Sequence, residues 1–105
     1  MKLSERQAKF SLMVALLIQY AHLLGYSLTF GDAYSKVEFG VHSIDPPSFH
    51  FSRLAIDLNL FIDGVYQIDT EAHRPLGEFW KFIGGTWGGD FAKKDGNHYS
   101  YGEGV

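Results

Sequence analysis

The chain is organised around residues 48–57, which read Ser-Phe-His-Phe-Ser-Arg-Leu-Ala-Ile-Asp. Six residues lie between His50 and Asp57, and the chain then continues into the apolar segment 58–62, Leu-Asn-Leu-Phe-Ile. An aspartate buried in such a run must be paired or bound to a metal to offset the cost of its desolvation. The stretch therefore predicts a central strand that carries a candidate metal ligand.

A second stretch, residues 95–99, reads Asp-Gly-Asn-His-Tyr and holds Asp95 three positions before His98. A catalytic zinc usually has three protein ligands and an open position for water, and imidazole and carboxylate suit it. His50, Asp57 and His98 would supply two nitrogens and one oxygen, while Asp95 is the natural free carboxylate for proton transfer. By spacing alone, His50 could equally be a half-buried histidine and Asp57 a solvent-facing strand residue.

Four motifs follow one another along the chain: Ser48-x-His50, Ala55-x-Asp57-Leu58, Trp87-Gly88-Gly89-Asp90-Phe91 and Asp95-x-x-His98-Tyr99. In this order they resemble the M15 family of zinc peptidases, which includes D-alanyl-D-alanine carboxypeptidases and dipeptidases and the phage L-alanyl-D-glutamate endolysins. The resemblance covers the chain from about Leu28 to Tyr101. It is closest to the endolysin branch, in which Asp rather than Glu precedes the second histidine by three positions.

The resemblance implies His50, Asp57 and His98 as the zinc ligands and Asp95 as the catalytic acid and base. It also implies the fold shared with hedgehog signalling domains. Members of the family usually carry a Tyr-Arg pair shortly after the first strand, whereas this chain reads Tyr34-Ser35-Lys36. The missing arginine leaves Lys36 as the favoured positive charge for the oxyanion.

Three further residues are assigned to substrate binding: Ser48, Arg53 and Trp87. Arg53 would share a strand face with Asp57, because alternate residues of a strand point the same way; it is the second candidate for the oxyanion charge. Trp87 precedes Gly88-Gly89, and two glycines let a backbone approach a ligand closely. A plain glycine loop beside a core tryptophan is the alternative interpretation of that stretch.

A length of 105 residues predicts one domain spanning residues 1–105. Hydrophobic residues at 46% are ample for a core. The net charge of −3 and nine scattered Lys and Arg residues argue against a nucleic-acid partner. Without cysteine, any metal must be bound by histidine and carboxylate.

The N-terminus mimics a signal peptide, because basic residues precede an apolar run at positions 10–18. Glu5 within the charged part and the polar residues after the run favour a core helix instead. That run is also too short for a membrane span. We expect Ser4 to cap this helix with Gln7 in a capping box, and Gly25 to end it.

The remaining pattern predicts an α+β fold, in which a small antiparallel sheet packs against the N-terminal helix and a second helix. Strands are expected at 26–30, 53–62, 65–68 and 97–101, with a hairpin turn at Asp63-Gly64. The second helix would start at a Thr70 cap, tolerate Pro75 and stop at Gly84-Gly85, with His73 exposed near its start. Residues 32–49 would form a surface loop, whose His42 is expected to face solvent rather than a metal.

The function that the resemblance implies is a zinc-dependent peptidoglycan peptidase that hydrolyses the L-alanyl-D-glutamate bond of the stem peptide. The alternatives are a D-alanyl-D-alanine carboxypeptidase and a non-catalytic, zinc-stabilised cell-wall-binding module. We expect a monomer with Zn²⁺ as cofactor and the stem peptide as partner, without membrane or nucleic acid. The chain would be made in the host cytoplasm without a signal peptide and reach the wall after release.

Overall fold

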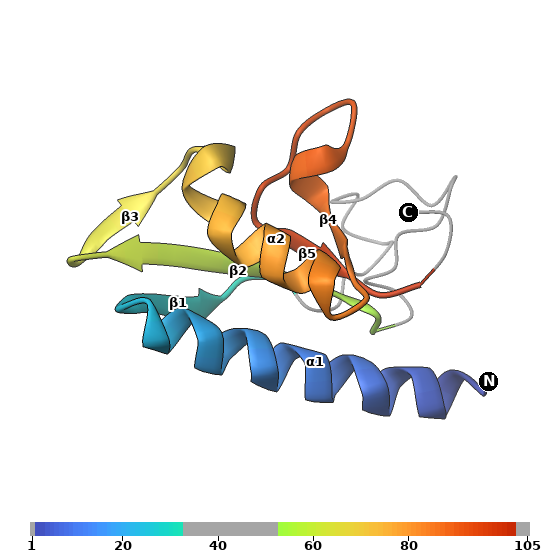
Figure 1. Cartoon of the computed structure of the whole chain (residues 1–105). Coiled ribbons are helices and arrows are strands. Elements are labelled where there is room, and N and C mark those ends of the chain that lie inside the picture. Colours follow the sequence, from blue (N-terminus) through green and yellow to red (C-terminus); the bar gives the residue numbers. More distant parts are fainter. Residues whose placement is uncertain (1, 33–52, 103–105) are drawn as a thin grey trace.

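The computed structural model describes residues 2–32 and 53–102. It opens with α1, the 21-residue helix Leu3–Leu23 (Figure 1). Five side chains at steps of three and four form its buried face: Phe10, Met13, Val14, Leu17 and Ala21. The stripe predicted from the sequence is therefore the face that this helix turns to the core.

The two ends of α1 differ in how well the sequence predicts them. Gly25 follows the helix with a φ of 83°, a left-handed conformation that glycine adopts without strain, and its N–H donates to His22 O at 3.0 Å. The predicted Ser4 cap is wrong, because the helix already starts at Leu3 and Lys2 occupies the capping position. The Glu5 side chain accepts a hydrogen bond from the Lys2 N–H at 3.0 Å and satisfies that end instead.

The sheet is antiparallel throughout and runs in the order β1-β2-β5-β4, with β3 also paired to β2. Its strands are β1 (Tyr26–Phe30), β2 (Ala55–Ile62), β3 (Val65–Gln67), β4 (Thr86–Trp87) and β5 (His98–Ser100). β1 lines one edge of β2, while β3 and then β5 share the other edge. With α1 and the second helix, α2 (Arg74–Phe82), this confirms the α+β fold.

The β2–β3 hairpin turns at Asp63 and Gly64, as the sequence predicts. Their φ angles are 53° and 77°, and two successive left-handed residues make the type I′ turn whose twist matches the strands. Aspartate and glycine tolerate this conformation better than other residues do.

The core lies between one face of β2 and the two helices, since every second side chain of the strand points there. The residues buried in the core here are Ile56, Leu58 and Leu60 of β2, together with Leu54, which directly precedes the strand. Trp80 of α2 joins the layers, with its ring centroid 5.9 Å from that of Phe10 and 5.9 Å from that of Tyr99. Figure 1 shows α1 alongside β1 and α2 crossing β2 and β5. The intervening residues of β2 face the opposite side.

The segment before α2 differs from the sequence prediction. Thr70 does not cap a helix; it opens the short 3-10 helix η3 (Thr70–His73), which has no side-chain cap and leads directly into α2. Pro75 does lie in the first turn of α2, where its missing N–H costs nothing. The prediction that His73 is exposed is wrong, because its side chain is only 3% exposed.

In the part of the chain that is described, no helix combines the length and the apolar composition needed to cross a membrane.

Candidate metal centre

Asp57 of β2 and His98 of β5 lie directly opposite each other in the antiparallel ladder. Opposed residues project from the same face, which here is the face turned away from α1 and α2. His98 Nδ1 is 3.8 Å from Asp57 Oδ1. His98 is buried and Asp57 half-buried. The prediction that the last strand carries His98 to the central strand is thus confirmed.

Asp95 joins this pair from the turn that leads into β5. The turn is closed by a hydrogen bond from the His98 N–H to Asp95 O at 3.1 Å. One ligand atom each from Asp57, Asp95 and His98 lie within 4.8 Å of one another. Two carboxylates and one imidazole at this separation are a donor set that a zinc ion accepts. The residues present therefore fit the metal that the sequence pattern indicates.

The turn that carries Asp95 is held by the side chain of Trp87 and by the backbone of Gly88. The Trp87 indole N–H donates to Gly96 O at 2.7 Å, and the Asp95 N–H donates to Gly88 O at 2.9 Å. A Cβ on Gly88 would collide with Asp95 O and would lie 2.8 Å from His98 Cβ. Glycine is therefore required at position 88 for the two loops of the site to meet.

The same contacts decide between the two interpretations of Trp87. Its side chain is fully buried, and the glycines beside it pack against protein: a Cβ on Gly89 would strike the Trp87 ring. The burial favours the core tryptophan. Any part that Trp87 has in substrate binding would therefore be indirect, through the turn that its indole holds.

Arg53 does not lie on β2 beside Asp57. The strand starts at Ala55, and Arg53 precedes it in a turn with a φ of 56°. The prediction that Arg53 shares a strand face with Asp57 is therefore wrong. It assumed that side chains alternate along a strand from residue 53, whereas the strand starts two residues later. The other predicted site residues, Lys36, Ser48 and His50, lie outside the described residues, as does His42.

Sequence reasoning missed a buried pair behind the site. His73 Nδ1 and the Tyr99 hydroxyl are 2.8 Å apart. Burial lowers the pKa of His73 to about 4 and raises the pKa of Tyr99. Both groups are therefore neutral at pH 7. A signal was present, because His73 stands three and seven positions before the buried Leu76 and Trp80, and so continues their stripe.

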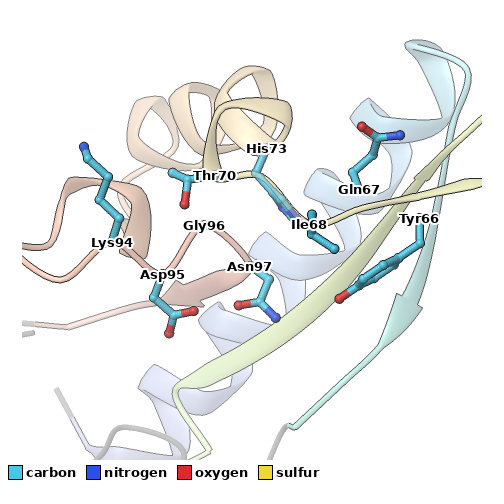
Figure 2. Close-up of a pocket in the computed structure, with 9 residues that line it drawn as sticks. All are labelled: Tyr66, Gln67, Ile68, Thr70, His73, Lys94, Asp95, Gly96 and Asn97. Carbon is cyan, nitrogen blue, oxygen red and sulfur yellow. The ribbon is translucent and has the colours of Figure 1, made fainter.

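A pocket of about 190 Å³ opens beside the cluster (Figure 2). Asp95 belongs both to the wall of this pocket and to the group of candidate ligands. The other lining residues come from β3, from η3 and its approach, and from the turn before β5: Tyr66, Gln67, Ile68, Thr70, His73, Lys94, Gly96 and Asn97.

Part of the chain matches a known protein family. A family model of M15 peptidases, described as D-alanyl-D-alanine carboxypeptidase, matches residues 43–101, more than half of the chain. The matched region contains β2, β5 and all three clustered residues. No curated protein matches the chain.

Proposed function

The chain belongs to the M15 family of peptidases, and from this we propose that it is a zinc-dependent peptidase of bacterial peptidoglycan. The proposed bond is that between L-alanine and D-glutamate in the stem peptide. The proposed setting is lysis of a bacterial host, with a monomeric single domain acting on the wall after release from the cytoplasm.

The observation that carries the proposal is the convergence of Asp57, Asp95 and His98 within 4.8 Å. The three differ in exposure: His98 is buried, Asp57 half-buried and Asp95 exposed. Asp57 and His98 also sit on paired strands, which hold them more rigidly than a turn holds Asp95. This difference favours Asp57 and His98 as metal ligands and leaves Asp95 to exchange protons with water. His50, from the sequence motif, would be the third ligand.

A zinc ion in this group would polarise the scissile carbonyl and acidify a water molecule. The part proposed for Asp95 is to accept the proton of the attacking water and then to deliver it to the leaving amine. An exposed carboxylate suits that part, since it can exchange its proton with solvent between turnovers. For the charge that develops on the carbonyl oxygen we propose Lys36 as the positive partner, with Arg53 as the second candidate.

A D-alanyl-D-alanine carboxypeptidase is the second candidate function, because the matching family is described by that activity. Both reactions would use the same metal and the same base. They differ in which bond of the stem peptide is opened, and so in their products.

The test is to incubate the zinc-loaded chain with the stem pentapeptide still attached to N-acetylmuramic acid and to identify the products by mass spectrometry. Release of N-acetylmuramoyl-L-alanine supports the endopeptidase, and release of free D-alanine supports the carboxypeptidase. A chelator should stop either reaction, and zinc should restore it. If zinc binds but neither product forms, the chain is a non-catalytic module and the proposed function is wrong.

A further inference from the structure

The pocket beside Asp95 has a polar lining and a buried histidine. Gln67, Thr70 and Asn97 offer amide or hydroxyl hydrogen atoms, and Lys94 contributes an ammonium group. His73 also lines the pocket although it is 3% exposed, so its ring is part of the floor rather than the rim. Figure 2 shows the His73 ring between Thr70 and Ile68.

The contact with Tyr99 determines which proton His73 carries. The Tyr99 hydroxyl is buried and must donate its hydrogen. Among the described residues, its hydrogen-bond partner is His73 Nδ1, at 2.8 Å. Nδ1 is then the acceptor, so the neutral ring carries its hydrogen on Nε2. The histidine thus carries an N–H donor at Nε2, on a ring that lines the pocket.

The one carboxylate of the lining faces another way. Figure 2 shows the Asp95 side chain directed away from Thr70 and His73, and the group of candidate ligands includes this carboxylate. The Lys94 ammonium is 3.5 Å from Gly89 O, at the limit of a hydrogen bond, so a flexible lysine can leave that contact for an anion. The pocket therefore combines several donors and one mobile positive charge.

We propose that this pocket binds the α-carboxylate of the residue on the leaving side of the scissile bond, with Lys94 and His73 Nε2–H as its main partners. The inference rests on the proposed function. In both candidate substrates, the L-alanyl-D-glutamate bond and the D-alanyl-D-alanine bond, a free carboxylate is attached to the carbon beside the leaving nitrogen. Asp95, which would protonate that nitrogen, forms part of the same wall.

Lys94 is tested on the zinc-loaded chain with two peptides. One is L-alanyl-γ-D-glutamyl-L-lysine, and the other is the same peptide with the α-carboxylate of its D-glutamyl residue converted to a carboxamide. Loss of one charge-assisted contact in Lys94→Met should lower kcat/KM for the carboxylate peptide about 10-fold, mainly through KM. The carboxamide should be cleaved equally by both proteins. Lys93→Met is the matched control, because Lys93 is the neighbouring lysine and is not part of the lining. Equal losses on both peptides, or no loss, would overturn the assignment of Lys94.

Binding without turnover separates this inference from the proposed function. The zinc-loaded, ¹⁵N-labelled chain is titrated with the leaving product γ-D-glutamyl-L-lysine and with the same dipeptide amidated at the α-carboxylate of its D-glutamyl residue. We expect the amide signals of Thr70, Gly96 and Asn97 and the Nε2–H signal of His73 to shift with the carboxylate alone. Cleavage of the peptide without these shifts would refute the pocket and leave the peptidase intact. Shifts without cleavage would support the pocket and refute the proposed peptidase activity. A proton on Nδ1 of His73 would also overturn the inference.

Discussion

At the residue scale, the two carboxylates of the cluster differ in exposure, and this difference predicts different consequences of their removal. Asp95 is exposed on a turn, whereas Asp57 is half-buried on β2 opposite His98. A group that exchanges protons with solvent can lose its charge without disturbing the ligands. A metal ligand cannot lose its charge in this way, because its carboxylate binds the metal directly.

Asp95→Asn should therefore retain zinc and lose turnover by about 10²–10⁴-fold, the usual contribution of a general base. Metal analysis and steady-state kinetics on the same preparation measure both quantities. Asp63→Asn is the control, since Asp63 lies in the hairpin turn, where asparagine is equally acceptable. Wild-type turnover in Asp95→Asn would remove this residue from the mechanism.

The oxyanion charge is a second question at this scale. Loss of one oxyanion donor costs on the order of 10²–10³-fold in kcat. We expect Lys36→Ala to show this loss with unchanged zinc content, and Arg53→Ala to show a smaller one, since Arg53 lies in a turn outside β2. A mild effect in Lys36→Ala beside a severe one in Arg53→Ala would transfer the role to Arg53.

At the element scale, the sequence predicts those parts of the fold that follow from periodicity or turn chemistry. The stripe of α1 and the Asp63-Gly64 turn are of this kind, whereas the meeting of β5 with β2 is expected from the candidate metal ligands that the two strands carry. The misplaced residues lie where elements start. Thr70 and His73 lie in the short 3-10 helix η3 and Arg53 lies in a turn; the geometry of such short segments depends on tertiary packing, which a local pattern does not encode.

The structure around His73 gives the fold a specific pH dependence. Burial lowers the pKa of His73 from 6.5 to about 4 in the folded chain. Between these values the unfolded chain binds a proton that the folded chain does not, so stability falls as the pH drops from 6.5 towards 4. The full effect is about 3 kcal/mol, from roughly 1.4 kcal/mol per pKa unit.

The comparison variant is His73→Asn, whose side-chain oxygen can still accept a hydrogen bond from Tyr99 but does not titrate. Urea unfolding of the metal-free proteins between pH 7 and pH 4 should show a steeper loss of stability in the wild type than in the variant. His22→Asn, at an exposed position of α1, should keep the wild-type slope. Parallel slopes for the wild type and His73→Asn would contradict the assignment.

At the scale of the whole molecule, the candidate metal centre links segments that are distant in the sequence. Asp57 belongs to the central strand, whereas Asp95 and His98 belong to the last strand and the turn before it. These elements meet on the face opposite the helices, and among the described residues the main core cluster packs against the other face of the sheet. A metal bound there would join the two strands on the face that this cluster does not cover.

Zinc should therefore stabilise the fold as well as catalyse. A ligand that binds the folded chain alone adds about 3 kcal/mol at a free concentration roughly one hundred times its Kd. For a domain of this size, that raises Tm by roughly 10–20 °C. Calorimetry with zinc and with chelator measures the shift, and magnesium serves as a control, because it prefers oxygen ligands. His98→Ala and His50→Ala should lose most of the shift, whereas His22→Ala should retain it. A full shift in His50→Ala would remove His50 from the ligand set and make Asp95 the third ligand, since its carboxylate already lies within 4.8 Å of the other two.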